Sequence, residues 1–169
     1  MVTGGQRSGK SVFAENLALN LSERPVYLAT AEIFDEEMRR RVMIHRQRRE
    51  KRWRNLEESL HISALTLHEG DTVLVDCLTL WASNWFFKYN EATTQAFEAM
   101  QHELTRLFSH NITLILVTNE IGLGGVSENA TQRRFTDLQG SINQLVASAA
   151  DEVYLTVSGI PVKIKSVKP

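Results

Sequence analysis

A glycine-rich segment near the start of the chain has the residue types and spacing of a phosphate-binding loop. It reads Gly-Gly-Gln-Arg-Ser-Gly-Lys-Ser and satisfies G-x-x-x-x-G-K-[ST] at every fixed position. Glycines let the backbone curl so that its N–H groups point at phosphate oxygens. In such a loop Lys10 supplies charge to the β- and γ-phosphates, and the Ser11 hydroxyl is a ligand for Mg²⁺. The expected nucleotide contacts are Gly4, Gly5, Gln6, Arg7, Ser8, Gly9, Lys10 and Ser11.

An apolar run that ends in an acid, Val73 to Asp76, has the pattern of a Walker B strand. Its carboxylate would hold Mg²⁺ directly or through water. Such runs are common, and a solvated or capping carboxylate explains Asp76 equally well when the strand is read alone. The phosphate-binding loop upstream favours the metal role.

His45 lies inside a strongly basic stretch. Between Arg39 and Arg54 the chain has nine Lys or Arg residues and one acid, Glu50. Read alone, His45 shares a helix face with apolar neighbours and fits a packed histidine. The surrounding arginines suggest a second interpretation, because they could hold a triphosphate beside an imidazole, which is a competent nucleophile towards phosphorus. A solvated basic face and a nucleic-acid footprint are the alternatives, although Trp53 is the only aromatic residue nearby.

Short apolar runs alternate with segments of helical period, which predicts an α/β fold with a mostly parallel sheet and flanking helices. We expect one P-loop nucleotide-binding domain over residues 1–169. Expected strands are 1–3, 26–29, 72–76 and 112–117, with a C-terminal hairpin formed by 153–157 and 161–165; expected helices are 10–21, 35–52, 78–87, 93–108 and 130–150. Residues 53–67 carry no clear pattern.

The predicted topology brings several polar residues to one edge of the sheet, because ligands of open α/β sheets bind beyond the carboxyl ends of the strands. Thr30, Asp76, Asn119 and Glu120 would lie there beside the phosphate-binding loop. For Glu120 a solvated loop acid is an equally good interpretation.

The composition places limits on the function. The formal net charge is −1, so the whole molecule is not a polyanion binder, and we expect no nucleic-acid partner. Cys77 is the only cysteine, which excludes an internal disulfide and a cysteine-based zinc site. We see neither a signal peptide nor an apolar run long enough to span a bilayer, and we expect a cytoplasmic protein.

The segment from Thr3 to Ser11 resembles the P-loop of the adenosylcobinamide kinase / adenosylcobinamide-phosphate guanylyltransferase family of cobalamin biosynthesis. Further blocks resemble this family in the same order over essentially the whole chain. They are Tyr27–Ala31, Asp35–Met38 with Arg41, His45, Arg49, Trp53 and Glu57, then Val75–Thr79, Val117–Gly122, Glu128–Asn129, Arg134–Asp137 and Ala150–Val153. One departure is Ser127, which stands where the family usually has proline.

The resemblance implies two activities. A nucleoside triphosphate, ATP or GTP, phosphorylates the aminopropanol hydroxyl of adenosylcobinamide. A histidine, which matches His45, then attacks the α-phosphate of GTP, expels pyrophosphate, and passes GMP to the substrate phosphate. The resemblance also implies a RecA-like sheet, a homotrimer and catalytic roles for His45 and Lys10. Implied nucleotide contacts are Ala29, Thr30, Ala31, Arg46, Gln47, Arg48, Arg49, Glu57 and Thr79, with Asn119 and Glu120 in a substrate loop.

Two other functions remain open at this point. One is a simple small-molecule kinase in which His45 is structural. The other is a non-catalytic nucleotide-binding module with a basic nucleic-acid arm, whose affinity would fall steeply with salt.

Overall fold

The computed structural model describes residues 1–32, 36 and 52–167. Within these ranges a seven-stranded sheet has the order β3-β2-β4-β5-β1-β6-β7. The first six strands in this order are parallel, and only β7 runs antiparallel to its neighbour β6. The strands are β1 Val2–Gly4, β2 Val26–Ala29, β3 Arg54–Glu57, β4 Thr72–Asp76, β5 Thr113–Val117, β6 Glu152–Val157 and β7 Ile160–Ser166.

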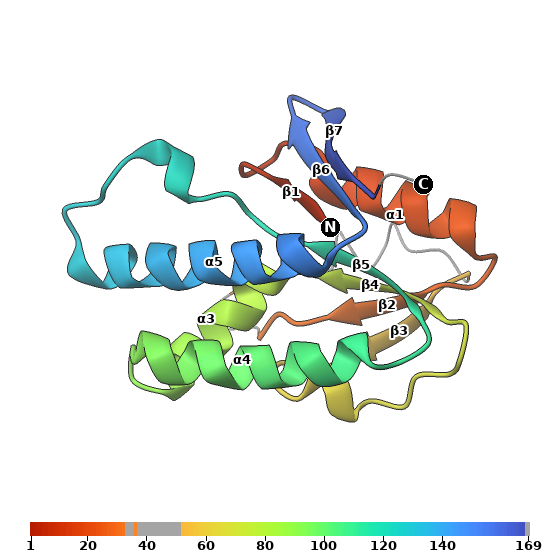
Figure 1. Ribbon diagram of the computed structural model, residues 1–169, viewed down its shortest axis with the longest axis horizontal. Helices are drawn as coiled ribbons and strands as arrows, with labels where there is room; N and C mark the ends of the chain where they lie inside the picture. The colour runs from red at the N-terminus through yellow and green to blue at the C-terminus, as the bar shows by residue number, and fades with distance from the viewer. Residues whose placement is uncertain (33–35, 37–51, 168–169) are drawn as a thin grey trace.

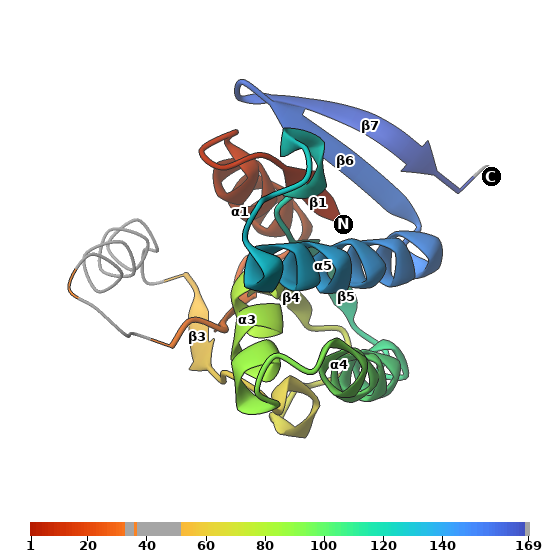
Figure 2. The same ribbon diagram turned by 90° about the vertical axis from the view of Figure 1, so that its left-hand side faces the viewer.

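Helices lie on both faces of the sheet (Figures 1 and 2). They are α1 Lys10–Leu21, α3 Leu78–Lys88, α4 Thr93–Phe108 and α5 Ala130–Ala149, with short 3₁₀ turns η1 Ile62–Ala64 and η2 Gly122–Gly124. Helices α3, α4 and α5 pack together on one face, and α1 covers the other. The predicted α/β class, with its mostly parallel sheet, flanking helices and C-terminal hairpin, is confirmed.

Central strand β4 shows why the sheet needs helices on both sides. Val73 and Val75 point into the core beneath α3, α4 and α5, whereas Leu74 packs against α1. All three side chains are fully buried. Because successive side chains of a strand point to opposite faces, a run without polar residues requires cover on both.

The predicted boundaries of helix 10–21, helix 93–108, strand 26–29 and strand 72–76 coincide with those in the structure. The other described elements differ by one or two residues. Segment 53–67, which had no clear pattern, contains β3 and η1. The predicted helix over 35–52 lies almost wholly outside the described residues.

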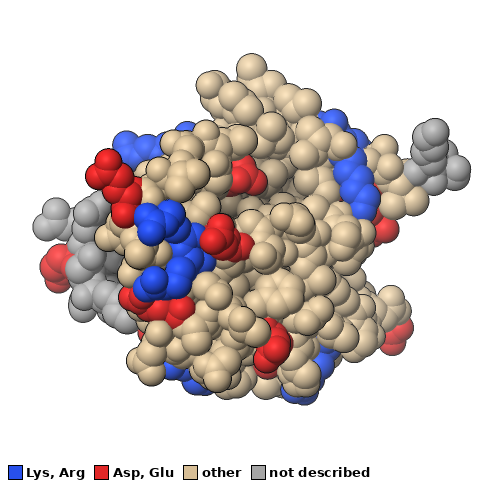
Figure 3. Space-filling model, turned by 60° about the vertical axis from the view of Figure 1, so that its left-hand side comes forward, with Lys and Arg blue, Asp and Glu red and all other residues tan. Residues whose placement is uncertain are grey.

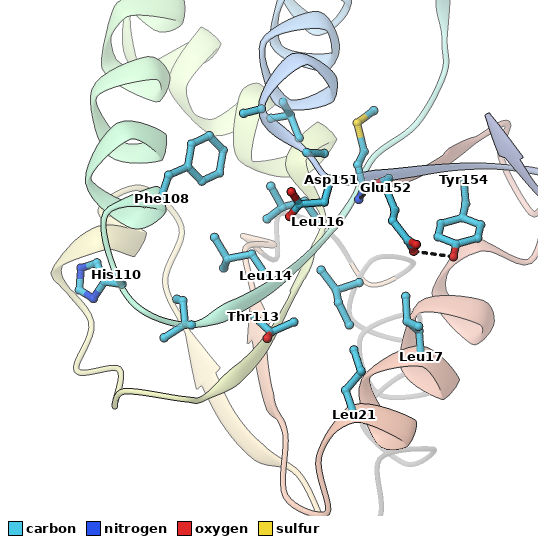
Figure 4. A pocket seen from close by; sticks show the side chains of 16 residues that line it. Leu17, Leu21, Phe108, His110, Thr113, Leu114, Leu116, Asp151, Glu152 and Tyr154 are labelled. Atoms are coloured by element: carbon cyan, nitrogen blue, oxygen red, sulfur yellow. Dashed lines mark hydrogen bonds between the residues drawn. The ribbon is translucent and has the colours of Figure 1, made fainter. Parts of the chain in front are cut away.

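A hollow of about 410 Å³ lies at the edge of the sheet where the parallel strands begin (Figure 4). Strand β1 is short and pairs with β5 only through Val2 and Val117. Beyond this pair, towards the starts of the strands, the space between β5 and β6 is lined mainly by apolar side chains, including Leu17, Leu114 and Leu116. The hollow is thus a consequence of the short β1.

No helix in the described part of the chain is long and apolar enough to cross a membrane.

Cys77 follows β4 directly and is buried. Burial raises the pKa of its thiol to about 12, and the nearby Asp76 carboxylate acts in the same direction. Since the thiolate is the reactive form, we expect alkylation of the folded protein at pH 8 to be at least about a thousandfold slower than that of a free cysteine. Mass spectrometry after iodoacetamide treatment measures this rate. Denatured protein, in which labelling should be complete, is the control, and rapid labelling of the folded chain would contradict the prediction.

Candidate nucleotide site

The loop between β1 and α1 has the backbone geometry of a phosphate cradle. Gly4 and Gly9 both have positive φ angles, 151° and 95°, and Arg7 also lies in the left-handed region. The turn of the loop is closed by the Ser8 N–H, which donates to the Gly5 carbonyl at 3.3 Å. Glycine is required at position 4 because an added Cβ would collide with the Thr156 carbonyl oxygen of β6.

The β6–β7 turn packs against this loop. The Gly159 N–H donates to the Ser8 carbonyl at 2.9 Å. A Cβ on Gly9 would come within 3.0 Å of the Gly159 Cα, so the two backbones are in close contact. The loop is therefore supported by contacts with residues near the C-terminal end of the chain.

Lys10 is the first residue of α1 and is 93% buried, with a relative exposure of 7%. Its ammonium donates to the Gly5 carbonyl at 2.6 Å. Burial lowers the pKa of Lys10, while the nearby Cys77 and Asp76 side chains act in the opposite direction. No acidic residue occupies the first turn of α1. The free N–H groups and the helix dipole at this end are therefore available to an anion.

Asp76 ends β4 and is half-buried. Strand β5 separates β4 from the P-loop strand β1. The Tyr27 hydroxyl donates to the Asp76 Oδ2 at 2.7 Å. Ser11, in the first turn of α1, is also half-buried. A hydroxyl and a carboxylate are oxygen ligands of the kind that Mg²⁺ prefers.

Thr30 follows β2 and is fully buried. Its hydroxyl donates to the Cys77 carbonyl at 2.8 Å and accepts the Cys77 N–H at 3.0 Å. Asn84 of α3 donates to the Thr30 carbonyl at 2.8 Å. The Thr30 side chain thus ties the ends of β2 and β4 together.

The segment after β5 is anchored at the same edge. The Asn119 N–H donates to the Thr79 hydroxyl at 2.9 Å, and the Glu120 N–H donates to the Gly4 carbonyl at 3.0 Å. A buried network lies behind them: the Thr118 hydroxyl donates to Asn143, whose amide donates to the Asn119 carbonyl. Gln139 donates to both Thr118 and Asn143.

The structure therefore brings most of the predicted residues to the carboxyl edge of the sheet, the side that faces the viewer in Figure 2. Gly4 to Ser11, Ala29, Thr30, Ala31, Glu57, Asp76, Thr79, Asn119 and Glu120 lie at or next to the carboxyl ends of β1 to β5. Ala29 and Glu57 are register partners at the ends of β2 and β3. His45, Arg46, Gln47, Arg48 and Arg49 lie outside the described residues.

Comparison with known proteins identifies the family. Residues 1–164 match the family described as cobinamide kinase / cobinamide phosphate guanyltransferase. The chain belongs to this family.

Three curated relatives are similar over nearly their whole length. The bifunctional adenosylcobalamin biosynthesis protein CobU of Escherichia coli K12 is 41% identical over 179 residues, which cover 98% of each chain. CobU of Salmonella typhimurium LT2 is 38% identical with the same coverage. CobP of Pseudomonas aeruginosa PAO1 is 40% identical over 169 residues, 98% of this chain and 96% of the relative. The enzyme family predicted from the sequence is thereby confirmed.

The side chains that hold the candidate site in place were not identified from the sequence. Tyr27, Gln139 and Asn143 each contact a predicted site residue or its neighbour. Polar residues within otherwise apolar strands and helices were the available signal. Their partners depend on which strand or helix packs beside them.

Gly4→Ala should destabilise the fold, because the new Cβ meets the Thr156 carbonyl and the φ angle is unfavourable for alanine. A clash plus backbone strain costs about 2–4 kcal/mol, which lowers the melting temperature of a chain of this size by roughly 5–10 °C. Calorimetry of both variants and the wild type measures the shift. Gly5→Ala is the matched control, since nothing lies within 4 Å of its added Cβ. Equal melting temperatures for the two variants would contradict this account.

Proposed function

We propose that this chain phosphorylates adenosylcobinamide with a nucleoside triphosphate and then transfers GMP from GTP to the product, giving adenosylcobinamide-GDP and pyrophosphate. The observation that carries the proposal is the P-loop, with Lys10 at an open helix N-terminus and Asp76 nearby at the same sheet edge. Membership of the family supports the choice of reactions. The printed names of the relatives describe bifunctional proteins of adenosylcobalamin biosynthesis.

In the kinase step the P-loop amides and Lys10 hold the β- and γ-phosphates of ATP or GTP. On phosphate binding, the Lys10 ammonium turns from the Gly5 carbonyl to the triphosphate. The substrate hydroxyl attacks the γ-phosphorus, the bond to the β-phosphate oxygen breaks, and the hydroxyl proton is lost to solvent. Catalysis in such a site comes from positioning and charge neutralisation.

Mg²⁺ fits the residues present. Ser11 and Asp76 would hold it, and it would neutralise charge on the phosphates when bound. No group of three or more His, Cys, Asp or Glu side chains that could hold a metal occurs among residues 1–32 and 52–167. Mg²⁺ commonly keeps waters and takes further ligands from substrate phosphates, so two protein ligands are sufficient.

In the guanylyl-transfer step we assign the nucleophile to His45. A ring nitrogen attacks the α-phosphorus of GTP, the bond to the β-phosphate breaks, and pyrophosphate leaves. An oxygen of the corrinoid phosphate then attacks the same phosphorus, breaks the N–P bond and frees the histidine. Arg46, Arg48 and Arg49 would neutralise phosphate charge, with Gln47, Glu57, Thr79 and residues 29–31 as further GTP contacts.

We place the corrinoid against the loop after β5, next to Asn119 and Glu120. The side chains of Leu123 and Val126 are 82% and 89% exposed, although both are apolar. Beside them lies a hollow of about 550 Å³, bounded by this loop and the first turns of α5, including Arg133. An apolar rim next to a polar hollow suits a broad macrocycle with amide side chains.

Charged residues on this side of the molecule do not form a continuous patch of one sign. In the space-filling view acidic and basic side chains are interspersed, and much of the surface carries neither (Figure 3). The described residues of this face thus show no continuous basic surface, and the absence of a nucleic-acid partner stays a prediction.

We further propose a homotrimer. Edge strand β7 exposes Ile160, Val162 and Ile164 at 66%, 49% and 58%. Ile160 and Val162 share one face of the strand, and Ile164 lies at the register shift between β6 and β7. Exposed apolar side chains on an open edge strand form a surface that another subunit would cover. The cytoplasmic location stays a prediction.

Incubation with α-labelled GTP should give a covalent, acid-labile protein adduct, because a phosphorus–nitrogen bond to imidazole hydrolyses in acid. His45→Ala should abolish the label, and Lys10→Ala should reduce it strongly. The control is His102→Ala, which changes an exposed histidine of α4. Autoradiography after electrophoresis gives the readout. Unlabelled wild-type protein that still transfers the γ-phosphate would point to a simple kinase, and unchanged labelling of His45→Ala would exclude this nucleophile.

Leu123→Asp should weaken corrinoid binding while leaving nucleotide chemistry intact. In the proposed complex the corrinoid covers the Leu123 side chain, and this apolar contact stabilises the complex by about 1.4 kcal/mol. Its loss corresponds to a roughly tenfold higher KM for the corrinoid. Pyrophosphate release in the absence of corrinoid should not change. Leu21→Asp, a substitution of an exposed leucine at the far end of α1, is the control. A normal corrinoid KM for Leu123→Asp would remove this loop from the substrate site.

A further inference from the structure

The Tyr27 hydroxyl of β2 makes a long-range hydrogen bond to the Asp76 carboxylate at the end of β4. Tyr27 is a register partner of Leu74, and Ala29 is the partner of Asp76. Tyr27 and Asp76 are therefore diagonal neighbours on the α1 face of adjacent parallel strands. A phenol is long enough to bridge such a diagonal, and its hydroxyl donates to Asp76 Oδ2 at 2.7 Å.

The ring of Tyr27 is held firmly in place. The residue is 3% exposed and belongs to the cluster between the sheet and α1. Trp53, immediately before β3, packs edge-on against it, with ring centroids 5.7 Å apart and an interplanar angle of 82°. A side chain fixed in this way presents its hydroxyl at one position, so the hydrogen bond restricts the orientation of the carboxylate.

We propose that Tyr27 is a positioning residue for the Asp76 carboxylate, and that it prepares this group to bind Mg²⁺ together with the nucleotide. The inference rests on the metal role of Asp76 in the proposed function. A carboxylate has two oxygens and about four lone-pair sites. Tyr27 occupies one site on Oδ2 and leaves the others to the metal or its waters. The ordering cost of the carboxylate is then met during folding, before the nucleotide arrives.

The proposal predicts a selective defect. Tyr27→Phe keeps the ring and its contact with Trp53 but removes the hydroxyl. Asp76 then keeps its charge and loses its fixed orientation. Affinity for the magnesium complex of a non-hydrolysable GTP analogue should fall about tenfold, as expected for a lost hydrogen bond to a charged group. Affinity for the same analogue in excess EDTA should not change. Titration calorimetry measures both, and no turnover is needed.

Tyr154→Phe is a closely matched control. Its hydroxyl also donates to a carboxylate at 2.7 Å, but this carboxylate, Glu152, is exposed at the start of β6. Tyr154→Phe should leave both affinities unchanged. Melting temperatures of the variants establish that each is folded. Should Tyr27→Phe be unstable, Trp53→Phe provides a second test, because it loosens the ring without removing the hydroxyl and should weaken magnesium-dependent binding to a smaller extent.

A double-mutant cycle separates the inference from the proposed function. If Tyr27 acts through Asp76, Tyr27→Phe should have no further effect on magnesium-dependent binding in an Asp76→Asn background. An equal loss of affinity with and without magnesium, or no loss, would overturn the inference. If Asp76→Asn itself leaves magnesium-dependent binding intact, the metal role of Asp76 is wrong. A magnesium defect in Asp76→Asn with none in Tyr27→Phe would reject the positioning role alone.

Discussion

The close contact between the P-loop backbone and the C-terminal hairpin is the constraint on which the candidate site depends. Gly4 lies against the Thr156 carbonyl, and Gly9 against Gly159. A phosphate cradle needs a backbone that turns sharply and exposes its amides, which is an unfavourable conformation for an isolated loop. Here the backbones of β6 and of the turn that follows it pack against the loop. The turned conformation of the loop is therefore held by contacts within the chain itself, and α1 begins directly after it.

Other groups at the carboxyl edge are also held in place by contacts with neighbouring elements, but these contacts are hydrogen bonds and not backbone packing. Thr30 joins the ends of β2 and β4, and the Asn119 and Glu120 amides attach the next loop to Thr79 and Gly4. Each contact satisfies groups that would otherwise be buried without partners. The result is an edge in which residues from separate strands keep fixed positions relative to one another.

Much of this arrangement was predictable from the sequence, because strong local signals marked it. The P-loop motif, the apolar run ending at Asp76, and the periodicity of 10–21 and 93–108 are all local. Strand β3 was not predictable, since Leu56 is the only apolar residue among its four and the strand is stabilised by pairing with β2. The role of Tyr27 was also hidden, because a tyrosine in an apolar strand resembles an ordinary core residue until the register of the neighbouring strand is known.

The network of Thr118, Gln139 and Asn143 separates a fixed stem from an exposed tip in the loop after β5. It fastens the stem of the loop after β5 to a helix that also covers the sheet, whereas the tip around Leu123 extends into solvent. Tip residues can therefore be exchanged without disturbing the phosphate cradle. If this tip contacts the acceptor molecule as proposed, acceptor preference can vary between relatives through residues 121–127 while the P-loop stays unchanged.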